Sequence, residues 1–340
     1  MRVALVKLSS LGDVVHALPV AAALRRGLPQ ARLTWIVERR EAAILHGNAA
    51  LDEVVPVDTR GWRRALDLRA LWRPLGAVHA GGAISELARH LRAARFDVAL
   101  DLQGLLKSGV LTAMTGAPLR IGFAARHCRE PVNALFTNHR VTPPPEARHV
   151  VEQYLALLAP LGVRAGPVTF PLPADARAEA GMDDFLAAAG LKPARRLVLL
   201  NPGAGRADKR WAVERFRALA ARLVEEAAAS VLVVWGPDEH STARDIAGGP
   251  APGVRLAPPT NLGELLALLR RASVVVAGDT GPVHLAAALG TACVGLYGPT
   301  PAERNGPWGQ VGRALQSPTG ALDGIAVDAV FRAVTEALEP

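Results

Sequence analysis

The chain alternates short apolar runs with stretches of helical periodicity, and it does so in two successive series. Strands that alternate with helices of this length are typical of βαβ units and a mostly parallel sheet. Between the two series lies 162–173, a run rich in glycine and proline that is typical of a linker. The chain has 340 residues, which suits two domains of about 150 residues each. We therefore predict an α/β protein with two similar domains.

The periodicity also locates the individual elements. The first series predicts strands at 3–8, 33–37, 53–57, 98–102 and 120–122, and helices at 14–28, 41–45, 65–71, 85–94, 105–114 and 149–161. After a helix at 175–189, the second series predicts strands at 196–201, 230–235, 254–256, 274–277 and 292–296. Its helices are expected at 213–226, 241–247, 262–271, 282–289 and 321–338. The expected domains are 1–165 and 174–320, with 321–340 as a C-terminal helix. Open α/β sheets bind ligands at the carboxyl ends of their strands, and two such domains place a cleft between them.

The most informative of these loops runs from Asp279 to Leu285, between an expected buried strand and an alanine-rich helix. A proline at the first helical position leaves a helix N-terminus with free N–H groups, which is a ready site for a phosphate. An unpaired carboxylate would repel a diphosphate, so either Asp279 or Thr280 is expected to cap this helix. That leaves Thr280, Gly281 and His284 nearest the phosphates, although His284 has the alternative of a buried structural histidine.

The loop after the first strand carries one carboxylate, Asp13, beside Gly12. This loop is no dinucleotide fingerprint, because it lacks the G-x-G-x-x-G pattern. Asp13 has two interpretations. It caps the following helix, where Asp contributes ~1 kcal/mol, or it is a general base that takes a proton from an acceptor hydroxyl.

The loop 201–211 follows the first strand of the second domain and contains glycines, among them Gly205, that let the backbone approach a ligand closely. It is not a Walker A loop, because Asp208 stands where a glycine must precede the lysine. The loop delivers Lys209 and Arg210 to the cleft, where two cations can neutralise a diphosphate leaving group. The alternative is a solvated basic loop.

An acidic residue, Glu239, follows the next strand. Acidic side chains in that place commonly accept hydrogen bonds from a ribose diol. The alternative is an acidic first helical turn, which the helix dipole favours.

Composition limits the class of partner. The net charge of +8 and the isoelectric point of about 10.4 favour an anionic partner. Nucleic acid is disfavoured, because the 4% of aromatic residues provide few stacking platforms. Cys128 and Cys293 lie far apart without ligand spacing, which predicts a reducing compartment and no metal site. We expect a cytoplasmic protein, since Lys7 and Asp13 interrupt any secretory signal and no apolar run is long enough to span a bilayer.

Taken together, 7–20, 201–211, 235–239 and 279–300 resemble the ADP-heptose:lipopolysaccharide heptosyltransferase family over nearly the whole chain. The most specific part is 279–290 followed by 295–300, and 9–13 is similar to the heptosyltransferase I branch in particular. The resemblance implies the GT-B architecture, in which two Rossmann-like domains face each other across a cleft. It also implies that the C-terminal helix crosses back onto the first domain.

The resemblance further implies an activity. This is the inverting transfer of L-glycero-D-manno-heptose from ADP-heptose to Kdo of Kdo-lipid A, with no metal or other cofactor. It would place the enzyme at the inner face of the inner membrane, with peripheral membrane contact. Its implied donor site consists of Gly12, Gly205, Lys209, Glu239, Thr260, Asp279, Thr280, Gly281 and His284, with Asp13 as the base, Lys209 as the diphosphate ligand and Thr260 near the adenine.

The acceptor carries anionic Kdo and phosphate groups, which call for arginines in the first domain. The candidates are Arg60, Arg63, Arg64 and Arg120, although in a chain this rich in arginine each has the alternative of a solvated surface charge.

Three other functions stay open at this point. The first is that of heptosyltransferase II or another glycan transferase of the same family. The second is that of a nucleotide-sugar 2-epimerase, and the third is that of a non-catalytic nucleotide-binding module. For the base itself, we expect Asp13→Asn to keep stability and donor binding while losing turnover, because Asn caps a helix about as well as Asp.

Overall fold

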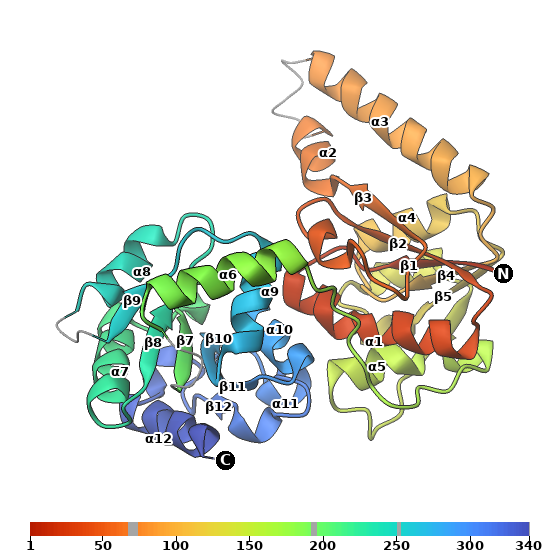
Figure 1. Ribbon diagram of the computed structural model, residues 1–340. Helices are drawn as coiled ribbons and strands as arrows, with labels where there is room; N and C mark the ends of the chain where they lie inside the picture. Colours follow the sequence, from red (N-terminus) through yellow and green to blue (C-terminus); the bar gives the residue numbers. More distant parts are fainter. Residues whose placement is uncertain (67–73, 192–195, 250–252, 340) are drawn as a thin grey trace. The chain divides into compact units, whose positions relative to one another are not determined.

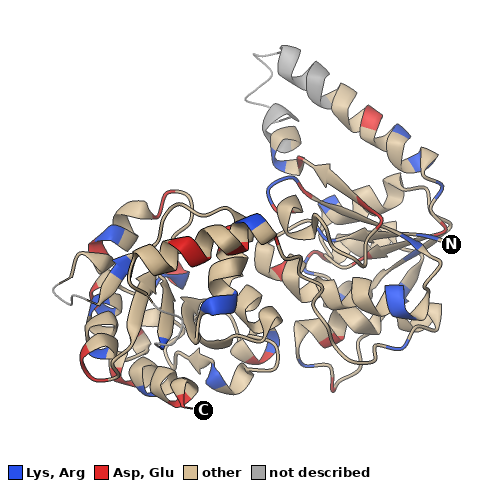
Figure 2. Ribbon diagram, viewed as in Figure 1, with Lys and Arg blue, Asp and Glu red and all other residues tan. Residues whose placement is uncertain are grey.

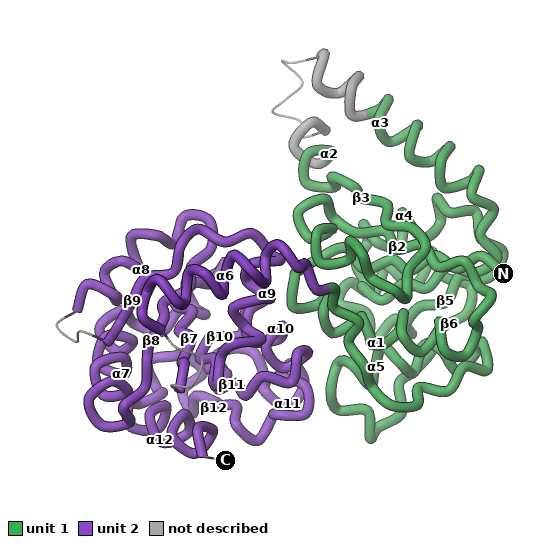
Figure 3. Tube along the Cα trace, viewed as in Figure 1, with its two compact units in different colours: residues 1–173 green, residues 174–340 purple. Residues whose placement is uncertain are grey.

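The computed structural model describes residues 1–66, 74–191, 196–249 and 253–339 (Figure 1). The chain divides into two compact units, unit 1 at Met1–Pro173 and unit 2 at Ala174–Pro340 (Figure 3). The division falls at the end of the predicted linker 162–173. The facing of the two sheets across a cleft stays a prediction.

Unit 1 contains a six-stranded parallel sheet in the order β3-β2-β1-β4-β5-β6. Its strands are β1 (Arg2–Val6), β2 (Arg32–Glu38), β3 (Glu53–Val57), β4 (Val98–Asp101), β5 (Leu119–Phe123) and β6 (His139–Val141). The sequence did not predict β6. This edge strand has three residues, none of them buried, so it carries no apolar run.

Three helices of unit 1, α1 to α3, begin earlier than predicted, whereas α4 and α5 begin one residue later. They are α1 (Leu11–Gly27), α2 (Thr59–Leu66), α3 (Pro74–Ala93), α4 (Leu106–Met114) and α5 (Val150–Ala156), with 3-10 helices that include η1 (Ala42–Leu45), η3 (Ala125–His127) and η4 (Pro131–Phe136). The predicted helix at 65–71 starts at Thr59, and its last residues, 67–71, lie outside the described residues. The predicted start of α1 at 14 is three residues late, because Ser10 and not Asp13 is the N-cap.

The central strand β1 is buried on both faces, since Val3, Ala4, Leu5 and Val6 are all fully inaccessible. Ala4 and Val6 belong to a core cluster that also contains side chains from α3 and α4. Strand side chains alternate, so Val3 and Leu5 point to the other face, where Figure 1 shows α1 and α5. Two layers of helices therefore cover the sheet, which explains the continuous apolar runs of its strands.

Unit 2 repeats this plan with a sheet in the order β12-β11-β10-β7-β8-β9, again with every pairing parallel. The strands are β7 (Leu197–Asn201), β8 (Ser230–Val233), β9 (Val254–Leu256), β10 (Val274–Gly278), β11 (Ala292–Tyr297) and β12 (Leu315–Gln316). The helices are α6 (Ala176–Ala188), α7 (Val213–Glu225), α8 (His240–Ala247), α9 (Leu262–Arg271), α10 (Gly281–Leu289), α11 (Ala302–Asn305) and α12 (Val327–Leu338). Counted within each unit, both strand orders are 3-2-1-4-5-6, the Rossmann order. The predicted α/β class with two Rossmann-like domains is confirmed.

The last helix differs from the expectation. It begins at Val327 and not at 321. Its apolar face, with Val330, Val334 and Leu338, belongs to the core of unit 2 and packs beside α7. This face is covered by its own unit, and the expected crossing of the helix onto the first domain stays a prediction.

Two glycines of unit 2 give a matched test of these local conformations. A side chain on either Gly181, inside α6, or Gly290, after α10, would meet open space. Only Gly290 has a positive φ, 80°, as the left-handed residue that ends its helix. We expect Gly181→Ala to raise the free energy of unfolding by about 0.5–1 kcal/mol. We expect Gly290→Ala to lower it by about 1 kcal/mol. Urea denaturation measures both, and equal effects would contradict the left-handed C-cap.

Candidate functional site

Both units place the predicted chemistry at the point where the strand order reverses. In unit 1 this point lies between β1 and β4, and in unit 2 between β7 and β10. Crevices at such switch points, beyond the carboxyl ends of the strands, are where open α/β sheets bind ligands. The loop after β1 carries Asp13, and the loops after β7 and β10 carry Lys209 and Asp279.

Asp13 lies inside the first turn of α1, at its third position, and Gly12 is buried next to it. Its Oδ2 accepts hydrogen bonds from the backbone N–H of Ser10 at 3.1 Å and from the Ser10 hydroxyl at 3.0 Å. This is the acidic half of a capping box. The interpretation of Asp13 as the N-cap is therefore wrong, although the residue does stabilise the start of the helix. The side chain stays 28% exposed.

The other oxygen of Asp13 faces a buried lysine. Lys7 is 2% exposed, and its Nζ lies 3.5 Å from Asp13 Oδ1, donates to the Tyr154 hydroxyl at 2.6 Å and donates to the Leu102 carbonyl at 3.2 Å. The Tyr154 hydroxyl in turn lies 3.4 Å from Asp13 Oδ1. Lys7 and Tyr154 were not among the predicted site residues. A charged residue directly after a buried strand was a signal for Lys7, but nothing in the sequence links α5 to this loop.

The pair keeps both groups charged. Burial raises the pKa of Asp13, but the charge of Lys7 and the hydrogen bonds from Ser10 outweigh it, so the pKa lies below its usual value. Burial lowers the pKa of Lys7, but the charge of Asp13 and the contact with Tyr154 outweigh it, so the pKa lies above its usual value. Asp13 is thus an ionised, partly exposed carboxylate at neutral pH.

Gln103 fixes the loop that precedes Asp13. Its Oε1 accepts from the backbone N–H groups of Leu8 at 2.8 Å and Ser9 at 3.3 Å, and its Nε2 donates to the Ser9 carbonyl at 2.7 Å. Gln103 is itself held by Asp101, whose Oδ1 accepts from the N–H groups of Gln103 at 2.8 Å and Gly104 at 3.0 Å. Burial raises the pKa of Asp101 despite these bonds. The loops after β1 and β4 are therefore one hydrogen-bonded unit.

The four predicted acceptor arginines have different surroundings. Arg60 is exposed on α2. Arg63 and Arg64 belong to the same helix, and their side chains lie outside the described part of the structure. Arg120 is half-buried, and its guanidinium donates to the carbonyls of Phe136 at 2.9 Å and Ala117 at 2.8 Å. These bonds give Arg120 a structural task. Figure 2 shows the basic residues spread over both units.

In unit 2, Asp279 connects the loop after β7 to the N-terminus of α10. One of its oxygens pairs with Lys209, and the other lies 3.0 Å from His284 Nε2. Burial raises the pKa of Asp279, but the hydrogen bond and charge of His284 and those of Lys209 outweigh it, so the pKa lies far below its usual value. The Asp279 carboxylate is therefore paired, so the repulsion of a diphosphate that the sequence suggested for an unpaired carboxylate does not apply. Thr280 is the N-cap residue, and its hydroxyl donates to the Gly278 carbonyl at 3.3 Å.

Two close approaches of the backbone assemble the rest of this edge. A Cβ on Gly278 would lie 2.8 Å from the Lys209 carbonyl oxygen, so only a glycine lets the two loops meet. A Cβ on Gly203 would likewise collide with the Glu239 carboxylate, which accepts from the Gly236 N–H at 2.8 Å. These contacts bring Lys209, Asp279 and Glu239 to the carboxyl end of one sheet. Two predicted donor residues contribute no such contact: Gly205 is exposed, and Thr260 is half-buried just before the N-cap of α9.

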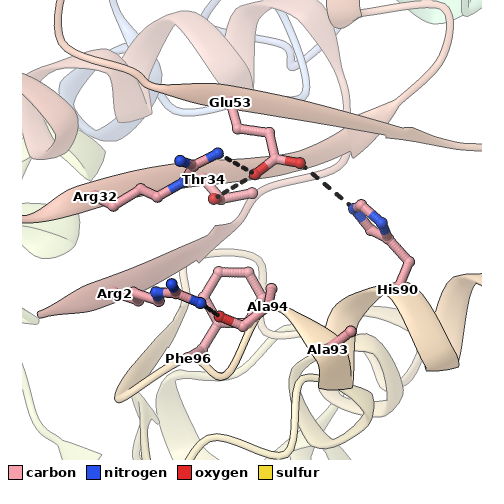
Figure 4. A pocket seen from close by; sticks show the side chains of 8 residues that line it. All are labelled: Arg2, Arg32, Thr34, Glu53, His90, Ala93, Ala94 and Phe96. Atoms are coloured by element: carbon pink, nitrogen blue, oxygen red, sulfur yellow. Dashed lines mark hydrogen bonds and ion pairs between the residues drawn. The ribbon is translucent and has the colours of Figure 1, made fainter.

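A cavity of about 360 Å³ lies beside the amino ends of the strands of unit 1, opposite to the carboxyl ends that carry Asp13 (Figure 4). The Glu53 carboxylate occupies its wall and contacts Arg32 at 3.4 Å, Thr34 at 3.3 Å and His90 at 3.4 Å. None of the predicted site residues lines it. Because its charges already satisfy one another, this cavity is not part of the candidate site.

The described ranges contain no group of three or more His, Cys, Asp or Glu side chains placed to hold a metal ion. Within the same ranges, none of the helices combines the length and the apolar character that crossing a membrane requires.

The pattern of glycosyltransferase family 9 (heptosyltransferase) matches residues 84–323. The chain belongs to this family. Lipopolysaccharide heptosyltransferase 1 of Pseudomonas aeruginosa is 34% identical over 313 residues, which cover 91% of this chain and 82% of that protein. The predicted resemblance to the ADP-heptose:lipopolysaccharide heptosyltransferase family, and with it the enzyme class of glycosyltransferase, is confirmed.

Solved family 9 structures show the same fold. E. coli heptosyltransferase WaaC with ADP has a TM-score of 0.79 and 28% identity, covering 99% of this chain and 100% of that one. The E. coli WaaC structure with ADP-2-deoxy-2-fluoro heptose has a TM-score of 0.78 and 28% identity, covering 99% of both chains. The predicted GT-B fold class is thereby confirmed.

The buried pair of unit 1 predicts a coupling in stability. Lys7→Met leaves the Asp13 carboxylate without its cation, and Asp13→Asn leaves the Lys7 ammonium without its anion. We expect each single change to lower the free energy of unfolding by about 1–3 kcal/mol, below the usual range for buried pairs because Asp13 is 28% exposed. The double variant has no unpaired charge, so it should be more stable than the sum of the two losses predicts. Additive losses in chemical denaturation would contradict the pairing.

The triad of unit 2 predicts a pH dependence. Because the pKa of Asp279 is lower in the folded state than in the unfolded state, its contribution to stability is present at neutral pH and is lost on acidification. We expect Asp279→Asn to unfold more easily at pH 7 by about 2 kcal/mol. The difference should shrink as the pH falls below about 4, where the unfolded carboxyl protonates. The exposed Asp323→Asn is the control, expected to change stability by less than about 0.5 kcal/mol at any pH.

Proposed function

We propose that this family 9 protein transfers L-glycero-D-manno-heptose from ADP-heptose to a Kdo hydroxyl of Kdo-lipid A, in the inner core of lipopolysaccharide. The observation that carries the proposal is Asp13, an ionised and partly exposed carboxylate at the switch point of unit 1. The relative from P. aeruginosa bears the name lipopolysaccharide heptosyltransferase 1, and the WaaC structures contain ADP and an ADP-heptose analogue.

Asp13 is the general base of the proposed reaction. Its carboxylate takes the proton of the acceptor hydroxyl while the hydroxyl oxygen attacks the anomeric carbon of the heptose. The new bond joins that carbon to the acceptor oxygen, and the bond to the β-phosphate oxygen breaks, so ADP leaves and the configuration inverts. Lys7 keeps Asp13 deprotonated before the attack, and Gln103 holds the loop that aims it.

Lys209 and the N-terminus of α10 receive the leaving group. The backbone N–H groups in the first turn of α10 suit a diphosphate, and Asp279 pairs with Lys209 just before that turn. We assign Thr280, Gly281 and His284 to the phosphates, Glu239 to the ribose and Thr260 to the adenine. Gly12 and Gly205 are assigned to the backbone around the donor. These groups are proposed to stabilise the charge on ADP with no metal or other cofactor.

Three of the four candidate acceptor-binding arginines belong to α2. We propose that Arg60, Arg63 and Arg64 bind the anionic groups of Kdo-lipid A, and that the structural bonds of Arg120 leave it a lesser part. We also propose that the protein is cytoplasmic and peripheral to the inner face of the inner membrane, where such an acceptor is presented. Nucleic acid is not a proposed partner.

The release of ADP from ADP-heptose, with and without Kdo-lipid A, tests the proposal. Release that depends on the acceptor is the expected result. A sugar nucleotide converted without any acceptor would indicate the 2-epimerase alternative, and ADP bound without turnover would indicate the binding module. Heptosyltransferase II, or a transferase for another glycan, would release ADP only with a different acceptor.

The same measurement tests the base. We expect Asp13→Asn to lower turnover by a factor on the order of 10² to 10⁴. It should leave ADP binding, measured by calorimetry, unchanged. Contrary to the expectation from the sequence, this variant should also lose stability, because Lys7 loses its counterion. It is therefore assayed at a temperature where circular dichroism shows it folded.

Ser10→Ala is the matched control for the geometry. It removes the hydroxyl hydrogen bond to the same carboxylate but leaves the base in place. Its turnover should fall by less than roughly tenfold, in line with the loss of about 1 kcal/mol expected for one such bond. Near-normal turnover of folded Asp13→Asn would remove Asp13 from the mechanism.

A further inference from the structure

The exposed hydrophobic side chains of the described residues are not scattered. Among the side chains that the structure describes, every exposed large hydrophobic one apart from Met1 lies on α4 or η4. Leu106 and Val110 belong to α4 and are 45% and 40% exposed, and Val132 and Leu135 belong to η4 and are 43% and 75% exposed. Single exposed hydrophobic residues need no explanation, but a gathering of them commonly marks a site of interaction.

These four side chains lie on two elements that pack against each other. Leu106 and Val110 are four residues apart in α4, and Ala113 continues their exposed stripe. Val132 and Leu135 are three residues apart in a 3-10 helix, where such residues share a face. The two elements pack at Gly109, whose Cβ position lies 2.7 Å from the Phe136 ring. Gly109 is only about 60° around the helix from Leu106. The exposed face of α4 therefore lies next to the contact between Gly109 and Phe136, where η4 packs. We call this surface the α4–η4 patch.

The α4–η4 patch lies beside the switch point of unit 1. Leu106 follows Gln103 by three residues, and Gln103 is bonded to the Ser9 backbone in the loop that leads to Asp13. The backbone N–H of Leu106 donates to Glu130 Oε2 at 2.6 Å, which ties the start of α4 to the segment before η4. A partner seated on the patch is therefore close to the candidate base.

The charges around the patch are mostly positive. Arg126, Arg129 and Arg140 are exposed on or next to η3, η4 and β6, and Lys107 is half-exposed on α4 beside Glu38. Two acidic residues lie at this rim: Glu130, one of whose oxygens accepts from the Leu106 N–H, and the buried Glu38, which pairs with Lys107. Apolar side chains ringed by arginine and lysine suit a surface that offers hydrocarbon and negative charge together, which is the headgroup region of an anionic bilayer.

We propose that the α4–η4 patch docks unit 1 onto the surface of a membrane that contains anionic lipids. The inference deepens the proposed function, on which it rests, since docking there would bring Asp13 to the depth of a lipid-anchored sugar. A second copy of this chain is a poorer occupant. Four partly exposed side chains fall far short of the ~800 Å² per partner that a stable dimer buries, and a symmetric contact would set like-charged rims against each other.

Flotation of the full chain with vesicles tests the docking without donor or acceptor. We use vesicles of phosphatidylethanolamine with phosphatidylglycerol, and vesicles of phosphatidylcholine alone as the neutral comparison. Binding to the anionic vesicles is expected, with roughly tenfold weaker binding for the double variant Val110→Ser with Leu135→Ser. Equal binding of this variant and the wild type would overturn the proposal.

A second readout does not depend on lost binding. Leu135→Trp places an interfacial side chain on the patch, and its fluorescence should shift to the blue when anionic vesicles are added. The matched control is Ala188→Trp, on an exposed position at the end of α6 in unit 2, where no added shift is expected. Shifts of the same size at both positions would overturn the proposal.

Sedimentation velocity tests whether a second copy of this chain, and not a membrane, occupies the patch. If the serine variant changes the oligomeric state and not the vesicle binding, the patch is an interface between copies and the membrane proposal is wrong. The vesicle experiments and the ADP-release assay can fail separately, so the two proposals are distinguishable. Acceptor-dependent ADP release without vesicle binding would overturn only the docking, and vesicle binding without ADP release would overturn only the transferase.

Discussion

The structure depends on a charge buried at the end of a central strand. Lys7 directly follows β1 and is almost completely buried. Its buried charge is stabilised by the Asp13 carboxylate, the Tyr154 hydroxyl and the Leu102 carbonyl, which surround the ammonium group. Unit 2 has a comparable arrangement at its own switch point, where Lys209 is paired with Asp279. In both units the sheet order creates the crevice and an ion pair gives it chemistry. One pair leaves its anion partly exposed, as the proposed general base requires, and the other holds its cation beside a helix N-terminus.

In the proposed reaction, the two units divide the work according to these pairs. In unit 1 the cation is hidden and the carboxylate is reachable, an arrangement that suits the removal of a proton. In unit 2 the lysine and the carboxylate are both partly covered, and His284 binds the second oxygen of Asp279. The same Rossmann strand order thus supports opposite proposed tasks, because the residues in the loops at the two switch points differ while the strand order does not.

Much of the fold could be predicted from the sequence, because buried parallel strands read as continuous apolar runs. The edge strand β6 and the short β12 escaped, since neither has a buried residue. The loops after β1, β7 and β10 were found from their glycines and charged residues. Tyr154 and Gln103 were not, because their roles arise from contacts across about 95 to 147 positions of the chain. The N-cap at Ser10 was missed because Asp13 is itself a residue type that caps helices.

In the proposed reaction, the lowered pKa of Asp13 also governs the fate of the proton after the heptose has been transferred. A carboxyl group that has just accepted a proton beside the Lys7 ammonium is a stronger acid than an ordinary aspartic acid, so it does not retain that proton. Since the side chain is 28% exposed, water can carry the proton away. The same neighbour that keeps the carboxylate ready before a reaction therefore restores it afterwards. In the proposed reaction, one salt bridge therefore returns Asp13 to its ionised form.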